Sequence, residues 1–534
     1  MTPAEPLALT VLIAPFALLL VTAAAVRQPG RAAGVVLRLA GLAAPAGLLT
    51  AAGAALAVAV RGPMAVSIPL GPVPLAVAVR LDALSVALFG LVALLGAVVL
   101  RYSRNYLDGD ARHGAFMGAL AATIAAAMAM VVSGDLAQLT VMWILTSLAL
   151  HRLLLFYPGR PRAIVAARKK FVVARLGDAA LVAAVVLLWD TFGTTDVGHL
   201  LERAQAWRGD AVPAGLHWAA GLVVVAAALK SAQFPTHGWL VEVMDTPTPV
   251  SALLHAGILN GGAFLVVRLA PVMVLSPGAL HAMIVIGALT AAVASVARIT
   301  QHTVKGALAY SSAAHMGFTM LACGFGVFTL AILHLVAHSC YKAHAFLSAG
   351  SAVDVARASR VSGGKAAPGA AVLLAPLLAI ATVAGVAWLF GVSVRERPAD
   401  MALAGILAVG LTQLAGAVVA RPVSLRGCLV MVPAAAGTAL SFFALELAGA
   451  RIFANVVPAV TLVDPVTLGL MALVLLCFAL IGAGQLLLPA CATWPAWARA
   501  YLWFRNGFYA NACFDRCVGA LRVPAPVGPL KETR

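Results

Sequence analysis

The stretch GLVVVAAALKSAQFPTHGWLVEVMDTPTPVSALLHAG, residues 221–257, starts as an apolar helix that is then interrupted. Lys230 ends the apolar run, and Pro235, Pro247 and Pro249 follow it. Proline removes a backbone donor and breaks helices. Membrane helices tolerate such breaks where the freed backbone lines a cavity inside the protein. The stretch therefore predicts a broken membrane helix with Lys230 at the break, unless this lysine only extends its amine to the membrane surface.

The composition of the whole chain is that of a membrane protein. Of its 534 residues, 63% are hydrophobic and 10% are charged, whereas soluble domains carry about 25% charged residues; a water-soluble enzyme is therefore excluded. The net charge is +17, from 36 Lys and Arg against 19 Asp and Glu. These cations lie in short gaps between apolar runs, which indicates membrane topology and excludes a nucleic-acid partner. The seven cysteines form no CxxC pair, so neither a disulfide framework nor a zinc ribbon is predicted.

Apolar runs long enough to cross a bilayer, roughly 20 residues each, recur along the chain. They predict an all-α polytopic membrane protein with about 14–15 transmembrane helices. The first run has no cationic start and no cleavage site before Arg27, so it is predicted to be a retained span. The predicted spans are 7–26, 33–60, 79–100, 114–133, 135–156, 172–190, 216–233, 246–270, 278–297, 302–323, 326–350, 369–391, 402–420, 426–447 and 465–489.

Cations concentrate in the odd-numbered loops between these spans. The positive-inside rule then predicts cytoplasmic odd loops, with the N-terminus outside the cell inner membrane and the C-terminus in the cytoplasm. The loop Arg160–Lys170 is also a candidate docking surface, although topology alone explains its charge. Segment 491–534 mixes aromatic residues with Arg and Asn. This mixture predicts an amphipathic cytoplasmic segment that lies on the surface or binds a partner, and an aromatic belt explains its first part equally well.

Ionisable groups inside apolar helices are costly and mark ion or proton paths where they face a polar interior. Asp178 lies inside the sixth span, where a buried carboxylate needs a partner. Lys230 is the natural partner, and capping near Arg175 is the alternative. His255 lies well within a span, with Asn260 beyond it. Imidazole titrates near neutral pH and carries a proton on either nitrogen, so His255 is a candidate relay rather than a packed core histidine.

His334, His338 and Lys342 recur at positions i, i+4 and i+8 of LAILHLVAHSCYKAHAFLSAG, residues 330–350. That spacing puts them on one face of a helix. An HxxxH pair binds zinc only with further ligands, and this face offers none, so the stripe predicts a proton relay. Lys305, at the start of the tenth span, is either a bridge between two halves of the protein or a cytoplasmic anchor.

Residues 230–257 resemble the signature of the proton-conducting, antiporter-like subunits of respiratory complex I and of multisubunit sodium/proton antiporters. The runs VKGALAYSSAAHMGFTMLACG, residues 304–324, and LHLVAHSCYKAHAFLSAGS, residues 333–351, match the second half of the same family. The resemblance covers about 100–420. It implies two inverted five-helix repeats that contain broken helices. It also implies a hydrated central axis formed by Asp178, Lys230, His255, His334, His338 and Lys342.

The resemblance also divides the chain. Residues 1–110 and 423–490 are predicted to be N-terminal and C-terminal transmembrane helices, 111–272 and 273–422 the two repeats, and 491–534 the amphipathic segment.

Three departures from the family pattern bear on the subfamily. The family carries an essential Glu after Trp in its fifth helix, but residues 143–146 read WILT. Residues 369–391 contain no Lys where a Lys-bearing broken helix is expected, and no long lateral C-terminal helix is predicted. These departures weaken the complex I pumping scheme. By contrast, His237, Glu242 and Asn260 in HGWLVEVMDTPTPVSALLHAGILNGG resemble the DabB group, the membrane subunits of DAB-type inorganic carbon accumulation complexes.

The DabB resemblance implies a membrane subunit that is not itself an enzyme. Such a subunit is expected to conduct protons or sodium ions and so to drive CO₂ hydration by a DabA-like peripheral zinc subunit on the cytoplasmic side. No flavin, quinone, haem or metal motif appears, so no cofactor is predicted in this chain. The alternatives are a pumping subunit of NADH–quinone oxidoreductase and a subunit of a multisubunit Na⁺/H⁺ antiporter. Lys305 joins the implied pathway, and the implied gating or coupling residues are His237, Glu242, Asp245, Pro247, Pro249 and Asn260.

Overall fold

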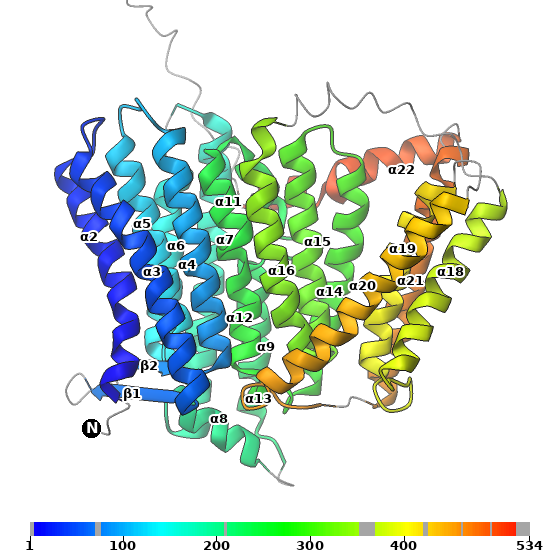
Figure 1. Cartoon of the computed structure of the whole chain (residues 1–534), viewed down its shortest axis with the longest axis horizontal. Coiled ribbons are helices and arrows are strands. Elements are labelled where there is room, and N and C mark those ends of the chain that lie inside the picture. Colours follow the sequence, from blue (N-terminus) through cyan, green and yellow to red (C-terminus); the bar gives the residue numbers. More distant parts are fainter. Residues whose placement is uncertain are drawn as a thin grey trace, which may run out of the picture.

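The computed structural model describes residues 5–69, 76–157, 159–207, 211–351, 369–419, 425–460, 463–491 and 494–518. Most of these residues lie in helices that run alongside one another through the molecule (Figure 1). The first part of the chain contains α1 (Glu5–Leu9), η1 (Thr10–Leu12), α2 (Ile13–Arg27), α3 (Gly34–Arg61), β1 (Met64–Pro69), β2 (Ala76–Leu81), α4 (Ala83–Tyr106), α5 (His113–Val131), α6 (Leu136–Leu154), α7 (Pro161–Phe192), α8 (Val197–Ala206) and α9 (Ala214–Lys230).

The second part of the chain begins with short helices, continues with long ones and ends with short ones. It contains α10 (Gly238–Glu242), η2 (Val243–Asp245), α11 (Thr248–Ala256), η3 (Ile258–Asn260), α12 (Gly261–Arg268), α13 (Ala270–Met273), α14 (Pro277–Ile299), α15 (Val304–Gly324), α16 (Phe328–Leu347), η4 (Ala349–Ser351), α18 (Gly369–Leu389), α19 (Pro398–Val419), α20 (Leu425–Ile452), α21 (Pro465–Cys491), α22 (Pro495–Arg505), η5 (Gly507–Tyr509) and α23 (Ala510–Val518).

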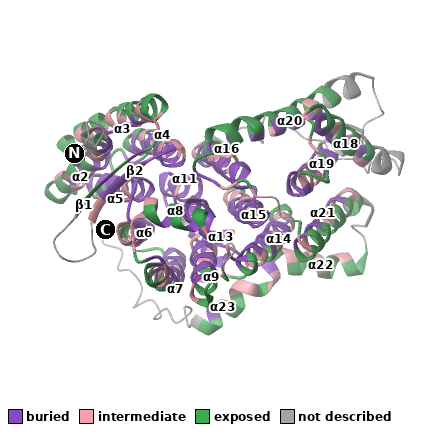
Figure 2. Cartoon of the chain, turned by 90° about the horizontal axis from the view of Figure 1, so that it is seen from below, coloured by how far each residue is buried: buried purple, intermediate pink, exposed green. Residues whose placement is uncertain are grey.

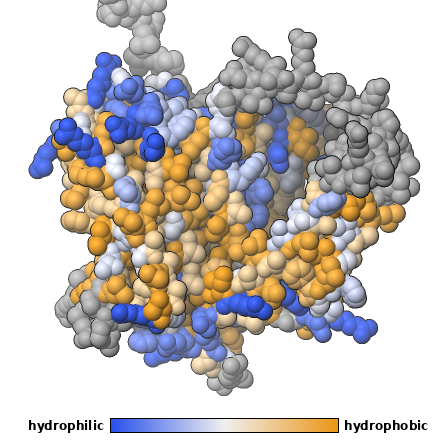
Figure 3. Space-filling view, viewed as in Figure 1, coloured by the Kyte–Doolittle hydropathy of each residue, from blue (hydrophilic) through white to orange (hydrophobic). Residues whose placement is uncertain are grey.

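Within the described residues, ten helices are long and apolar enough to cross a membrane, and three shorter helices are also apolar. Their outer faces carry large apolar side chains such as Phe16, Leu49 and Trp388, which are 62%, 73% and 78% exposed. Figure 3 shows these apolar surfaces as a broad band with hydrophilic residues above and below it. Such a band suits the hydrocarbon core of a bilayer. The prediction of a polytopic helical membrane protein is confirmed, and the relation between its two inverted repeats stays a prediction.

The all-α prediction missed a β-hairpin. β1 and β2 pair antiparallel, with Met64 opposite Leu81. Isolated bridges join Val79 to Ser133, and Asp135 to Asp196. The hairpin is therefore tied to the α5–α6 turn, and that turn to the segment before α8. The hairpin and α8 lie on one face of the molecule, called the hairpin face below, and α22 lies on the opposite one (Figure 1).

The loop predicted at Arg160–Lys170 is wrong. α7 begins at Pro161, whose fixed φ angle suits the first turn of a helix. Lys169 and Lys170 therefore lie inside the helix, and both are almost fully buried. Burial of two lysines requires specific partners for their amines, so this charge does more than set topology.

The helices around α9 to α12 are broken at two places that contact each other. α9 ends at Lys230, and the chain returns to helix at Gly238. Ser231 Oγ donates a hydrogen bond to the Leu259 carbonyl at the second break, at 2.9 Å. Gly262 permits this approach, because a Cβ there would overlap the Ser231 side chain. Figure 2 shows these elements in the buried centre of the molecule, and the residues of α11 and α12 are almost all buried.

A buried ion pair fixes the hairpin-face end of the broken helix that α11, η3 and α12 form. Arg268, at the end of α12, donates to both carboxylate oxygens of Asp82, at 2.5 and 3.2 Å. Asp82 also caps α4 by accepting from the Ser85 backbone amide at 2.9 Å. Arg80 adds a third cationic contact at 3.0 Å from a more exposed position. The pair thus joins β2, α4 and α12 across a large separation in sequence.

We expect Arg268→Ala to lower the free energy of unfolding by about 3–5 kcal/mol, because it leaves the Asp82 carboxylate buried without its main partner. The matched control Arg80→Ala removes a cation that is 21% exposed, and its cost is about 0–1 kcal/mol. Thermal unfolding of the full chain in detergent measures both. Equal melting temperatures for the two variants contradict the assignment.

Candidate ion pathway

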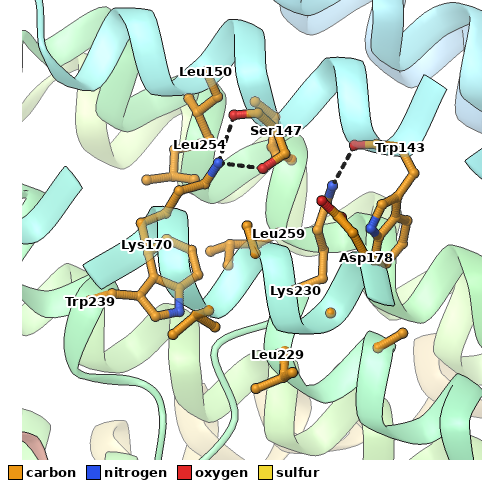
Figure 4. Close-up of a pocket in the computed structure, with 15 residues that line it drawn as sticks. Trp143, Ser147, Leu150, Lys170, Asp178, Leu229, Lys230, Trp239, Leu254 and Leu259 are labelled. Atoms are coloured by element: carbon orange, nitrogen blue, oxygen red, sulfur yellow. Dashed lines mark hydrogen bonds between the residues drawn. The ribbon is translucent and has the colours of Figure 1, made fainter. Parts of the chain in front are cut away.

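Lys230 lies at one side of a small cavity formed by α6, α7, α9 and the broken helix. The cavity has a volume of about 20 Å³ and is lined by Trp143, Ser147, Lys170, Asp178 and Lys230 among apolar residues. Figure 4 shows the polar atoms of these side chains directed toward the shared interior. A cavity of this size has room for one water molecule. Two amines and one carboxylate therefore share a largely apolar chamber.

The lysine at the helix break is held by Trp143. Lys230 Nζ donates to the Trp143 carbonyl at 3.3 Å and lies 4.1 Å from the centre of its indole ring. An ammonium over an indole face is attracted by the ring quadrupole. Trp143 precedes the positions where the family pattern places a Glu. In this chain a neutral aromatic ring and a carbonyl thus contact Lys230 from the fifth predicted span.

Asp178 forms an ion pair with Arg175, one turn earlier on α7, at 2.6 Å between Nη2 and Oδ2. The predicted partner Lys230 lines the same cavity, and Figure 4 shows its amine beside the Asp178 carboxylate. Of the two partners weighed from the sequence, Arg175 forms the ion pair, and Lys230 lies in the same cavity. The environment of Lys230 therefore depends on how Asp178 is paired.

Lys170 is a cavity residue that sequence reasoning missed. Its amine donates to both the carbonyl and the hydroxyl of Ser147, each at 2.7 Å. The predicted loop hid it, since positive-inside topology accounted for its charge. Its spacing of eight residues from Asp178 was the available signal, because residues i and i+8 share a helix face.

Three histidines form a second cluster between α15 and α16. His315 Nδ1 lies 3.2 Å from His334 Nε2, at hydrogen-bonding distance. The His315 ring also stacks on His338, with 5.0 Å between ring centres. His334 and His338 lie on one side of α16, as predicted, with ring centres 6.2 Å apart. His315 was missed, although it stands in the quoted run 304–324, because one histidine on a separate helix gives no spacing signal.

Lys342 and His255 extend this cluster. Lys342 is fully buried, and its amine donates to the Leu308 carbonyl at 3.0 Å. His255 is also fully buried and stacks on Phe346, with 4.4 Å between ring centres. Neither ring nitrogen of His255 hydrogen-bonds to a described residue. The same is true of both ring nitrogens of His338, so the cluster has unused hydrogen-bonding capacity in its interior.

Asn260 joins the two clusters. Its side-chain amide donates to Ser339 Oγ at 2.7 Å and to the Ala256 carbonyl at 2.8 Å. Ser339 directly follows His338 on α16. On the other side, a Cβ at Gly261 would lie 3.4 Å from Lys230 Cε, so Lys230 touches the backbone next to Asn260. Lys230 therefore lies next to the second break, and Asn260 links this break to the helix that carries the histidines.

Within the described residues, no group of three or more His, Cys, Asp or Glu could hold a metal ion. Residues 133–390, which contain both clusters, match the family model described as NADH:quinone oxidoreductase/Mrp antiporter, transmembrane. Residues 133–390, called the antiporter-like module below, therefore resemble the transmembrane part of this family.

Three similar proteins match large parts of this chain. The probable inorganic carbon transporter subunit DabB2 of Halothiobacillus neapolitanus is 41% identical over 348 residues, 65% of this chain and 63% of that protein. NADH-quinone oxidoreductase subunit L of Mycobacterium tuberculosis is 34% identical over 290 residues, 54% of this chain and 45% of that protein. The chain thus spans roughly half to two thirds of these curated relatives. The Mrp complex of a Dietzia species shares the fold, with a TM-score of 0.63 and 24% identity over 97% of this chain and 60% of that one.

Apart from Asn260, the predicted gating residues of this antiporter-like module lie at the α22-face end of the broken helix. His237 is buried and stacks on Phe234, with 5.5 Å between ring centres. Pro247 directly precedes α11, and Pro249 is the second residue of this helix. The side chain of Asp245 lies outside the described residues. Lys305 Nζ lies 3.5 Å from the carbonyls of Met244 and Thr246, so it contacts the turn between α10 and α11.

Glu242 contacts the chain's own C-terminal segment. Its carboxylate accepts from Lys169 Nζ and from Asn511 Nδ2, each at 2.5 Å. Lys169 also forms an ion pair with Asp515 on α23. The predicted amphipathic segment therefore includes a helix that docks on the antiporter-like module, and part of the charge at Lys169 is used for this intramolecular contact.

We expect Asp515→Asn to weaken the docking of α23 by about 1–3 kcal/mol, because it removes a charged partner of the fully buried Lys169. Hydrogen exchange of α23 amides in the full chain should accelerate accordingly. The control is Asp190→Asn, which changes an exposed carboxylate on α7, the helix that carries Lys169. Unchanged exchange in α23 would show that Asp515 does not hold the segment.

Proposed function

We propose that the chain is the cation-conducting membrane subunit of an inorganic carbon uptake complex. The observation that carries this proposal is the placement of interior ionisable groups on both sides of Asn260: Lys230 lies beside the second helix break, and the histidines lie on α16, which Asn260 contacts through Ser339. We propose that these groups form one ion route. Ionisable side chains inside a membrane protein are expensive and mark ion or proton pathways. This route lies inside the antiporter-like module, and 41% identity to a probable inorganic carbon transporter subunit supports the choice of complex.

In this proposal the ion moves as protons or sodium along the two clusters. Lys230 acts as the switching charge, because the Asp178 carboxylate, which pairs with Arg175, lies in the same cavity. A shift of Asp178 toward Arg175 releases the Lys230 ammonium, and a shift back stabilises it. His255, His338 and the hydrogen-bonded pair His315–His334 carry protons beyond Asn260, since neutral imidazole accepts on one nitrogen while it donates from the other. Lys342 and Lys305 complete the route toward the α22 face.

The energy of the cation gradient is proposed to reach a partner subunit. A DabA-like peripheral zinc subunit is proposed to bind the α22 face, which the cation distribution of the odd loops assigns to the cytoplasm. Zinc in that partner would supply the hydroxide that hydrates CO₂. This chain contributes no catalytic group and requires no cofactor of its own. Residues around the α10–α11 turn, with Glu242, Pro247 and Pro249, lie on the face where they can transmit the state of Lys230.

A second candidate function is a pumping or antiport subunit, because the matching family model is named for NADH:quinone oxidoreductase and the Mrp antiporter. One observation weighs against the pumping scheme. The family's Glu in the fifth helix is missing from residues 143–146, and Trp143 contacts Lys230 instead. The partners separate the candidates: a peripheral zinc protein for carbon uptake, quinone and iron–sulfur subunits for the pump, small membrane subunits for the antiporter.

We expect Lys230→Ala to reduce cation flux into proteoliposomes by roughly 100-fold, the typical contribution of one positioned proton-transfer group. A strain without carbonic anhydrase that depends on this complex should then fail to grow in air. The control Arg61→Ala removes one exposed cation at the end of α3, next to the β-hairpin and away from the α22 face, and should leave flux and growth unchanged. Normal growth and flux of the Lys230 variant contradict its role.

Purification of the tagged full chain from its native membrane tests the partner. We expect a stoichiometric peripheral protein that contains zinc by elemental analysis. Recovery of quinone-reducing subunits with iron–sulfur clusters overturns the carbon proposal and supports the pump, and recovery of small membrane subunits alone supports the antiporter.

A further inference from the structure

An acidic pocket lies on the hairpin face, away from both clusters of the proposed route. It has a volume of about 270 Å³. Three segments form it: the α15–α16 turn with the start of α16, the α18–α19 turn with the start of α19, and the end of α20. Its charged residues are Glu396, Arg397, Asp400 and Glu446. Three carboxylates therefore face one guanidinium, and the pocket attracts cations.

Two of these carboxylates are buried in the protein. Asp400 is 6% exposed and Glu446 is 5% exposed. Arg397 pairs closely with Asp400, at 2.5 Å, but its contact with Glu446 Oε1 is 3.6 Å long. Glu446 Oε2 is buried and has no hydrogen-bond partner among the described residues. A buried carboxylate oxygen without a partner is costly, and a bound cation or proton removes that cost.

The pocket opens at the foot of the helix that carries the histidines. Phe328 and Thr329, the first residues of α16, line it. His334 lies six residues further along α16, which is about 9 Å at the rise of an α-helix. α20 is in contact with α16 here, because a Cβ at Gly449 would lie 2.6 Å from Thr329 Cγ2. Glu446, one turn before Gly449, therefore lies close to the end of the proposed route.

We propose that Glu446 and Asp400 form a binding site for a monovalent cation, a proton or a sodium ion, at the hairpin-face mouth of the pathway. Arg397 holds Asp400 in place and leaves Glu446 as the exchangeable group. This inference rests on the proposed conduction function, and it adds the group that takes the ion from, or releases it to, the side opposite α22. The sequence alone gave no reason to single out Glu446, which is a lone carboxylate in the run SFFALELAGA, residues 441–450.

Carbodiimide labelling tests the site without relying on transport. Dicyclohexylcarbodiimide adds to a protonated carboxyl group in apolar surroundings: the carboxyl oxygen bonds the central carbon, the proton moves to nitrogen, and nothing leaves. We expect mass spectrometry of the wild-type full chain in detergent to find the adduct on Glu446, and not on the exposed Glu396. Labelling that sodium chloride slows, but choline chloride does not, identifies sodium. Labelling that only rises as pH falls identifies the proton. No labelling of Glu446 at any pH overturns the site.

Flux measurements test the role of the site at the mouth. We expect Glu446→Gln to lower proton or ²²Na⁺ flux into proteoliposomes several-fold while the melting temperature stays near that of the wild type. Glu202→Gln removes an exposed carboxylate of α8, on the same face but outside the pocket, and should conduct normally. Wild-type flux in Glu446→Gln, with Lys230→Ala inactive, overturns this inference alone. Absence of flux in the wild type overturns the conduction function instead, and labelling still decides whether Glu446 binds a cation.

Discussion

A helix that breaks inside a bilayer must find new hydrogen-bond partners for its backbone, since lipid supplies none. This constraint organises the centre of the molecule. At the break after Lys230, Thr290 of α14 accepts from the Phe234 amide at 3.0 Å. At the second break, the Leu259 carbonyl accepts from the Ser231 hydroxyl. This contact between the two breaks places Lys230 beside the backbone next to Asn260. The proposed route exists because the interrupted helices meet there.

Charges in the interior fall into two groups that differ in how completely they are paired. Arg268 and Asp82 use both ends of a bidentate contact, and both are almost fully buried. Both oxygens of the Asp82 carboxylate are used by Arg268, Ser85 and Arg80, so this carboxylate fixes structure and leaves no oxygen for an ion. Asp178 pairs with Arg175 in the cavity that also holds Lys230, and Glu446 has a buried oxygen without a hydrogen-bond partner among the described residues. Partly satisfied groups of this kind are costly to the fold, and they are the ones assigned here to ion movement.

The C-terminal segment shows that a charge which membrane topology explains can also have a structural role. Lys169 belongs to a cationic run that the positive-inside rule explains on its own. In the folded chain it contacts Glu242 and Asp515, so a predicted coupling residue is occupied by α23. Any partner that uses Glu242 on this face therefore meets an α23 helix that already covers it. The surface proposed to bind a peripheral subunit thus includes a part of this chain that is distant in sequence.

The sequence by itself determined that the chain spans a membrane, where its helices run, and that Lys230 stands at a helix break. These features depend on the lengths of apolar runs and on the positions of prolines, and both are local properties of the sequence. It also indicated the stripe of His334 and His338, because helical spacing is a local property.

Only the tertiary structure decided which charges meet. Lys170, His315 and Glu446 find their partners on other elements: Ser147 on α6, His334 on α16 and Arg397 in the α18–α19 turn. The β-hairpin and the placement of Asp178 and Lys230 in one cavity were likewise fixed by packing. Neighbour choice across helices depends on which faces pack together, and the apolar Ala- and Val-rich surfaces of this chain leave that choice open until the fold is complete.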